Sequence, residues 1–196
     1  MDNATDKKEQ IGSAAFAIFF KRGSLNFSMD YLAESLGMSK KTLYAYFRSK
    51  EEIVAFGVKN VFRDLEAAFA ELSAPPITSA EQLKTFLEDW FKVVLNYFSN
   101  VNFADLEDLR FKIPNVWKLV NEGRQNLIQK YFFKALLSAR DNGVIKKEIS
   151  LDMLIQVVQV IIKNLGTPET ILKFGGIRTF LEFISTVLTD GIINRP

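Results

Sequence analysis

The sequence predicts an all-α protein, in which an N-terminal three-helix helix-turn-helix domain precedes a larger helical domain. Three observations lead to this fold class. Apolar residues recur at the spacing of one helix face, as Ile11, Ala15 and Ile18 do in the first segment. Serines suited to helix N-caps stand before several apolar segments, and glycines follow some of them. No segment has a convincing strand pattern, and no repeat of fixed period runs along the chain.

The composition limits the chemistry that the chain can perform. Its 196 residues include no cysteine, which excludes disulfides and thiolate zinc sites and fits a reducing compartment. They also include no histidine, which excludes Ser-His-Asp triads and histidine metal clusters. We therefore expect neither an enzyme nor a cofactor or metal. The 18 phenylalanines predict either a bulky aromatic core or a cavity lined with rings.

Hydropathy and charge predict a soluble, cytoplasmic protein. Hydrophobic residues make up 48% of the chain and charged residues 24%, the balance of a globular protein. No apolar run approaches the length of a membrane span, and the polar, acidic residues 1–6 do not resemble a secretory signal. The net charge of +2 hides a local cluster, because four basic residues and no acidic one lie between residues 39 and 50: Lys40, Lys41, Arg48 and Lys50.

The first 50 residues have the pattern of a helix-turn-helix domain. An amphipathic helix ends at Gly23, and Ser28 caps a second helix that runs to about Leu36. After a turn that contains Gly37, Ser39 caps a third helix, from residue 40 to about residue 47. Two short helices joined by such a turn are typical of a helix-turn-helix, although an ordinary helical hairpin would have the same pattern.

The remaining residues, 51–196, are predicted to form the second, helical domain. Two capping boxes, Ser49–Glu52 and Ser79–Gln82, open long helices. Short helices and loops are expected at the prolines and glycines that follow. The helices expected in this part of the chain cover residues 49–72, 79–98, 103–109, a segment from Pro114 to about residue 142, 151–164 and 177–189.

The last two of these helices carry only a narrow polar stripe, for example Asp152, Gln156 and Gln159 on the first. A helix of this kind must bury two faces, one on its own domain and one on a partner. We therefore expect a homodimer; the alternative is a deeply buried pair of helices in a monomer. The predicted interface residues are Leu154, Val158, Ile161, Phe180, Ile184, Val187 and Leu188.

The stretch from Ser28 to Glu51 resembles the N-terminal domain of the TetR family of transcriptional regulators. The matching residues are Ala33 to Gly37, followed by Ser39-Lys40-x-Thr42-Leu43-Tyr44-x-Tyr46-Phe47-x-Ser49-Lys50-Glu51. Further along, residues 139–145 and Leu151 are similar to the family's link into its dimerisation helices. The resemblance implies a DNA-binding domain followed by a helical effector-binding and dimerisation domain.

The residues of the matched segment also suit contacts with DNA. Lys40, Lys41 and Thr42 begin the recognition helix, whose first turn enters the major groove, where lysine can donate to guanine and the threonine methyl can contact thymine. Position 41 is often Gly in the family, and position 30 is Asp here, which weakens the local attraction for DNA. A solvated basic face is the alternative. The predicted DNA-binding residues are Ser28, Ser39, Lys40, Lys41, Thr42, Tyr44, Tyr46 and Lys50.

The resemblance further implies a small-molecule cavity in the C-terminal helices. In the family, the ligand moves the long fourth helix, so that the two recognition helices of a dimer no longer match successive major grooves. We expect an apolar or aromatic effector; a plain aromatic core is the alternative. The predicted ligand-binding residues are Phe86, Trp90, Phe91, Phe103, Phe111, Trp117, Tyr131 and Phe132.

Together these features predict a homodimeric, ligand-responsive repressor that binds a palindromic operator in double-stranded DNA. A second interpretation is a helical carrier or sensor of apolar ligands that no longer binds DNA. A third is an all-helical enzyme that uses the carboxylates of Asp105, Glu107 and Asp108.

Overall fold

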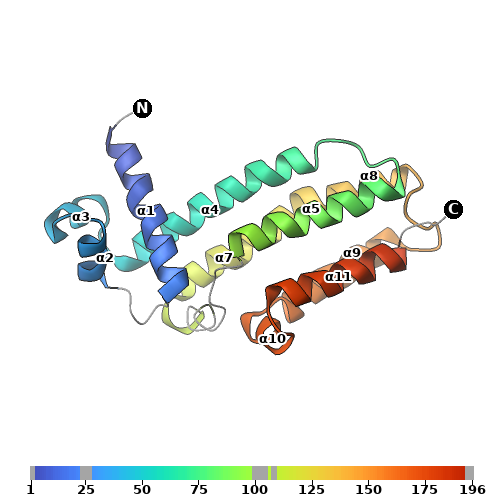
Figure 1. The fold of residues 1–196 in the computed structure, drawn as a ribbon. Coiled ribbons are helices and arrows are strands. Elements are labelled where there is room, and N and C mark those ends of the chain that lie inside the picture. The colour runs from blue at the N-terminus through green and yellow to red at the C-terminus, as the bar shows by residue number, and fades with distance from the viewer. Residues whose placement is uncertain (1–2, 23–27, 99–105, 107–109, 193–196) are drawn as a thin grey trace. The chain divides into compact units, whose positions relative to one another are not determined.

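The computed structural model describes residues 3–22, 28–98, 106 and 110–192, and these residues form helices and no strand (Figure 1). The all-α prediction is therefore confirmed. The helix expected over residues 103–109 lies outside the described residues, except for Leu106, which is helical and buried.

The chain divides into two compact units. The first comprises Met1–Asp64 and Asn100–Arg124, and the second Leu65–Ser99 and Gln125–Pro196. The division falls within two helices, α4 (Lys50–Leu72) and α7 (Pro114–Leu127), each of which contributes residues to both units. The domain limits expected from the sequence, 1–50 and 51–196, stay a prediction.

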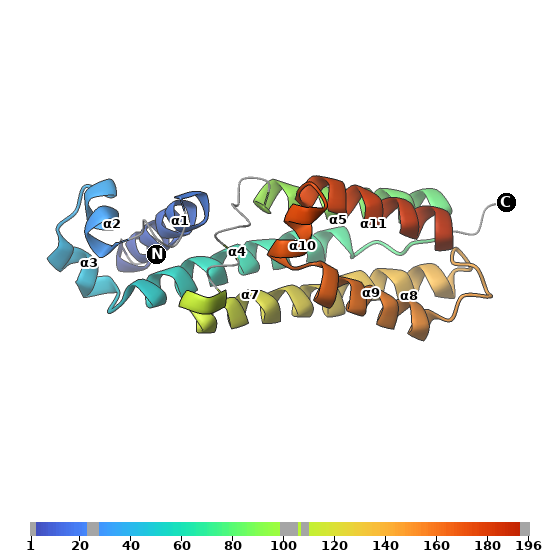
Figure 2. The same ribbon diagram turned by 90° about the horizontal axis from the view of Figure 1, so that it is seen from below.

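The first unit holds the predicted helix-turn-helix. Its helices are α1 (Asn3–Arg22), α2 (Met29–Ser35), α3 (Lys40–Tyr46) and the beginning of α4, and Figures 1 and 2 both show α2 and α3 beside α1. The turn after α2 depends on Gly37, whose φ of 61° is strained for other residues. The core of the first unit includes these fully buried apolar side chains: Ile11, Phe19, Leu32, Leu43, Phe47 and Ile53.

Helix α1 lies very close to α4. A Cβ atom placed on Gly57 would lie 2.6 Å from the carbonyl oxygen of Gly12 and 3.0 Å from the Cβ atom of Phe16. Beside this crossing, the Arg63 guanidinium contacts the Glu9 carboxylate at 3.0 Å. The two glycines therefore permit a helix–helix approach that no side chain would allow.

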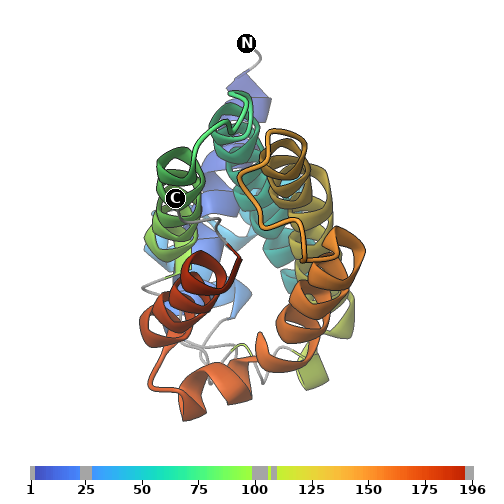
Figure 3. The same ribbon diagram turned by 90° about the vertical axis from the view of Figure 1, so that its right-hand side faces the viewer.

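The second unit is built from the end of α4, α5 (Ala80–Phe98), the end of α7 and four helices that follow. These are α8 (Phe133–Asp141), α9 (Leu151–Leu165), α10 (Pro168–Lys173) and α11 (Ile177–Ile192). Helix α11 packs against α5, and α9 packs against α8, as Figure 3 shows. Helix α10, capped by Thr167 and begun by Pro168, was not expected from the sequence.

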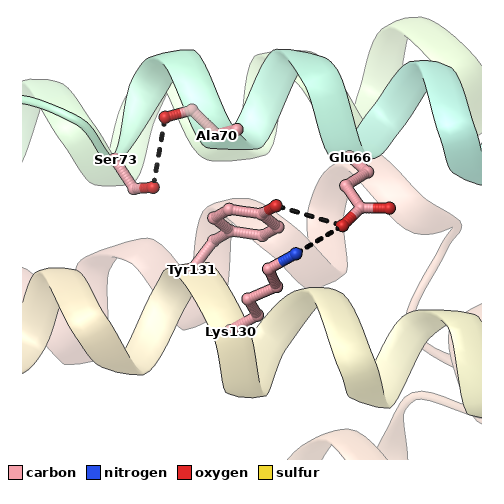
Figure 4. Close-up of polar contacts among 5 residues, drawn as sticks. All are labelled: Glu66, Ala70, Ser73, Lys130 and Tyr131. Carbon is pink, nitrogen blue, oxygen red and sulfur yellow. Dashed lines mark hydrogen bonds and ion pairs between the residues drawn. The ribbon is translucent and has the colours of Figure 1, made fainter.

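Between α7 and α8, residues Ile128–Phe132 form a π-helix, η2. Two neighbouring side chains of η2 reach the same carboxylate on α4 (Figure 4). The Lys130 ammonium donates to Glu66 Oε1 at 2.7 Å, and the Tyr131 hydroxyl donates to the same oxygen at 3.2 Å. These bonds, first that from Lys130 and then that from Tyr131, lower the pKa of Glu66. They also raise the pKa of Lys130, with Glu66 as the main cause.

We expect Gly57→Ala to destabilise the first unit, because the new methyl group would push α1 away from α4. Overpacking of this kind costs about 1–3 kcal/mol. Urea denaturation followed by circular dichroism measures the loss. Gly191→Ala is the control, since a Cβ atom there meets nothing within 4 Å and alanine favours the helix. Equal stability of Gly57→Ala and the wild type would contradict the close approach of α1 and α4.

We expect Glu66→Gln to lower the melting temperature at pH 7 by no more than about 3 °C, since the side chain is half exposed. Because the pKa of Glu66 is lowered on folding, its contribution is present above the ordinary carboxyl pKa and is lost as the pH falls through the lowered value. The two proteins should therefore converge in acid. The control Glu88→Gln removes a more weakly paired carboxylate, 3.9 Å from Lys84. A difference that persisted undiminished at pH 2 would argue against the pairing.

Candidate functional site

A serine side chain caps the start of each of the two helices α2 and α3. Ser28 Oγ accepts from the backbone N–H of Tyr31 at 3.1 Å. Ser39 Oγ accepts from the backbone N–H of Thr42 at 3.0 Å and also shares a hydrogen bond with the Thr42 hydroxyl at 2.8 Å. The side chains that follow Ser39 are thus attached to a well-ordered first turn.

The short helix α3 has a buried side and an exposed side. Leu43 and Phe47 are fully buried beneath it. Among the predicted DNA-binding residues of α3 and its flanks, Tyr46 and Lys50 are half-buried and the rest are exposed: Ser28, Ser39, Lys40, Lys41, Thr42 and Tyr44. The structure therefore presents most of these residues to solvent along α3 and beside it. Their part in DNA binding stays a prediction.

The ring of Phe47, at the end of α3, is held from two other helices. It lies edge-on to the ring of Phe56 on α4, with centroids 5.5 Å apart. The Lys8 ammonium of α1 lies 5.0 Å from the centroid of Phe47 and 5.4 Å from that of Phe56. Such cation–π contacts are attractive. The position of α3 is thus set by α1 and α4 as well as by α2.

Two lysines of this region have altered proton affinities. The hydrogen bond from Lys40 to the Asp30 carboxylate raises the pKa of Lys40, and the charge of Asp30 adds to this effect. Burial lowers the pKa of Lys50, and the nearby positive charge of Lys112 acts in the same direction against the opposing effect of Glu51. Sequence reasoning singled out Asp30 but missed its pairing with Lys40, because ten residues and a turn separate the two.

Four aromatic rings of the second unit are in mutual contact. Phe86, Trp90 and Phe132 have ring centroids 5.2–6.0 Å apart. Phe69 of α4, which was not among the predicted residues, stacks on Trp90 with a centroid distance of 3.7 Å. We call Phe69, Phe86, Trp90 and Phe132 the ring cluster. Its members, like Tyr131, are buried, so at this point the aromatic side chains fill the space between helices.

The other predicted ligand-binding residues are distributed more widely. Phe91 is half-buried in the second unit. Trp117, half-buried, and Phe111 belong to the first unit. Phe111 is 74% exposed, with the Arg110 guanidinium 5.7 Å from the centre of its ring. Phe103 lies outside the described residues. The prediction that these aromatic residues bind a ligand stays a prediction.

Helices α9 and α11 keep large apolar side chains exposed. Of the predicted interface residues, Val158, Phe180 and Leu188 are buried within the chain, Leu154, Ile161 and Ile184 are half-buried, and Val187 is exposed. The exposed apolar side chains recur at helical spacing on the two helices. We call them the apolar face: Met153, Val157, Val160, Phe183 and Val187.

Membrane spans and metal sites are not found in the described ranges. No helix there is both long enough and apolar enough to cross a bilayer. The acidic side chains in that part of the chain form no group that could hold a metal ion. Asp105, Glu107 and Asp108, the carboxylates of the enzyme hypothesis, lie outside the described residues.

Comparisons with known proteins agree with the helix-turn-helix assignment. Residues 11–55 match the family model of bacterial regulatory proteins, tetR family. The chain is also 26% identical over 131 residues to YvaF, an HTH-type transcriptional regulator of Bacillus subtilis (strain 168). That match covers 65% of this chain and 55% of the relative, so the chain spans little more than half of the length of YvaF.

Solved structures share the fold over almost the whole chain. A transcriptional regulator from Saccharomonospora viridis in complex with choline has a TM-score of 0.72 at 18% identity and covers 97% of this chain and 100% of its own. FadR, a fatty acid degradation regulator from Bacillus halodurans, has a TM-score of 0.68 at 17% identity, covering 96% and 97%. PfmR, a TetR family regulator from Thermus thermophilus, has a TM-score of 0.60 at 20% identity, covering 96% of each chain.

The matches to known proteins agree with the arrangement of α2 and α3 described above. The matched segment 11–55 contains the serine-capped helix pair and its exposed basic side chains, and the helical unit that follows has the fold of known regulators. Residues 11–55 thus match the DNA-binding region of bacterial regulatory proteins of the tetR family, and the whole chain shares the fold of solved transcriptional regulators.

Proposed function

We propose that this regulator is a cytoplasmic repressor that binds a palindromic operator as a homodimer and is released by a small apolar or aromatic effector. The observation that carries the proposal is the division of α3 into two sides. Leu43 and Phe47 anchor the helix from below, which leaves Lys41, Thr42 and Tyr44 outside. Side chains of these types suit the edges of bases and the phosphates of a major groove.

The residues around α3 divide into two groups by their chemistry. Lys41 and Thr42 stand in the first turn of the helix, where a recognition helix contacts base edges. Tyr44, Tyr46 and Lys50 stand further along, and their hydroxyl and ammonium groups suit phosphate oxygens. The first group would read sequence, and the second would position the protein on the duplex.

The apolar face supports a homodimer whose partner is a second copy of this chain. Met153, Val157 and Val160 follow one another at steps of four and three on α9, and Phe183 and Val187 are four apart on α11. A two-fold dimer would cover the same face on both copies. It would also supply two recognition helices, which a palindromic site requires about 34–36 Å apart. We therefore propose all members of the apolar face as interface residues, which includes the predicted interface residue Val187.

The ring cluster supports an apolar or aromatic effector. Phe69 belongs to the part of α4 that lies in the second unit, whereas Lys50 begins the same helix in the first unit. A ligand that enters among these rings must separate some of them, which would displace the α4 segment that bears Phe69. Coupling of this kind is reciprocal, so DNA-bound protein would bind the effector less tightly. The solved regulator from Saccharomonospora viridis is in complex with choline, which supports a small-molecule site in this fold.

In vitro selection of bound duplexes from a random DNA library tests the proposal. We expect enrichment of an inverted repeat whose half-site centres lie about 10 base pairs, or a multiple of that, apart. Binding should weaken steeply with salt. If no duplex were enriched and no salt-dependent binding appeared, the carrier or sensor of apolar ligands would be favoured instead.

We expect Lys41→Ala and Lys50→Ala to weaken binding in different ways. Removal of Lys41 should change the preferred base at one position of each half-site, at a cost of about 1–3 kcal/mol on the original operator. Removal of Lys50 should weaken binding on all sequences alike and reduce the slope of log K against log salt by about one per protomer. Repeated selection and salt titrations measure both effects. An unchanged consensus with Lys41→Ala would refute its role in reading bases.

We expect Phe183→Glu to dissociate the dimer, because the charge would be buried in the proposed interface. The dissociation constant should rise at least about thirtyfold, as for an interface residue that contributes about 2 kcal/mol or more. Sedimentation equilibrium measures the change. Phe111→Glu is the matched control, since this exposed phenylalanine lies in the first unit, outside the apolar face. If both variants remained dimeric, another surface would form the interface.

A further inference from the structure

We propose that Asp30 restrains the affinity of this protein for DNA by holding Lys40, so that Lys41 is the lysine that α3 offers to the operator. The inference deepens the proposed function and rests on the entry of α3 into a DNA groove. It assigns opposite parts to two neighbouring lysines that have the same chemistry. The residue responsible, Asp30, is on a different helix, α2.

The ion pair is short, and both partners remain accessible. Lys40 Nζ lies 2.6 Å from Asp30 Oδ1, and the two side chains are 55% and 69% exposed. Asp30 stands in the first turn of α2, where the helix dipole stabilises a negative charge. Among the residues that the structure describes, no acidic group pairs with Lys41, which follows Lys40 directly. The two lysines therefore differ in their surroundings although they are adjacent in the chain.

In water, an exposed ion pair of this kind contributes little stability. The ion pair should affect the affinity for DNA more than it affects stability, because each charge next to DNA faces a dense row of phosphates. If Lys40 stays paired, it neutralises no phosphate. If Lys40 turns to a phosphate, the Asp30 carboxylate loses its partner within a Debye length, about 10 Å at 0.1 M salt, of the same polyanion. In both cases Asp30 reduces the affinity.

The effects of the two residues should therefore depend on each other. With Asp30 present, removal of the Lys40 charge should weaken DNA binding less, since the carboxylate already compensates part of that charge. With Asp30 replaced, Lys40 is free to neutralise a phosphate, and its removal then weakens binding. Two substitutions that act through one ion pair are not additive, and a double-mutant cycle measures this dependence.

The experiment compares the wild type, Asp30→Asn, Lys40→Gln and the double variant. Fluorescence anisotropy is measured between about 0.05 and about 0.3 M NaCl on the duplex enriched by selection and on a scrambled duplex of the same composition. Glu34→Gln is the matched control, because it removes one exposed negative charge from the same helix without touching the ion pair. Thermal melts followed by circular dichroism establish that every variant is folded.

We expect Asp30→Asn to bind both duplexes about three- to tenfold more tightly at about 0.1 M salt, with a slope steeper by up to about one ion per protomer. Lys40→Gln should weaken binding by a smaller factor when Asp30 is present than in the Asp30→Asn background, so that the double variant loses the gain of Asp30→Asn. A purely structural role of Asp30 would not steepen the salt dependence.

Three results would overturn the inference while leaving the proposed function intact. Equal or weaker binding by folded Asp30→Asn would refute the restraint. A gain that persisted in the double variant would show that Lys40 is not involved. An equal gain with Glu34→Gln would show a general charge effect. By contrast, absence of salt-dependent binding by both the wild type and Asp30→Asn would overturn the proposed function itself.

Discussion

The close contact of α1 with α4 is the constraint on which the proposed DNA-binding surface depends. Helix α3 has only seven residues, too few for a helix to be stable by itself in water. It is held through Leu43 and Phe47, and Phe47 in turn lies against Phe56 of α4 and beneath Lys8 of α1. The glycines at the α1–α4 crossing bring these supports together. The orientation of α3, the proposed recognition helix, is therefore set by contacts that lie away from its exposed side chains.

Most of the helices, α10 excepted, could be predicted because their ends are encoded locally. Ser28, Ser39 and Ser150 act as N-caps where the apolar segments begin. In both capping boxes the serine accepts from the backbone three residues later, while Glu52 and Gln82 accept from the residue before the cap, Arg48 and Thr78. The π-helix could not be predicted, because one extra residue in one turn barely alters the periodicity of a long apolar segment.

The candidate site was predictable in composition but not in its contacts. Asp30 and Lys40 meet because of the angle at which α2 and α3 pack, which no local pattern encodes. On α9, the narrow polar stripe indicated two apolar faces, yet Val157 is exposed and Val158 is buried, a difference of one residue. Similarly, the number of phenylalanines did not reveal that Phe69 would stack on Trp90. Exposure and pairing follow from the rotation of each helix about its axis, and tertiary packing fixes that rotation.

The π-helix has a consequence for the helices on either side of it. Leu127, Tyr131, Ala135 and Ala139 are all buried, at regular steps of four residues. Over twelve residues, a regular α-helix would turn such a row about 120° away from its starting direction, because each residue advances by about 100°. The additional residue of the π turn takes up about 100° of that drift, which keeps the whole row directed at one core. The same residues wound as a regular α-helix would lose the alignment of the row, whereas a chain one residue shorter at this point would keep it without a π turn.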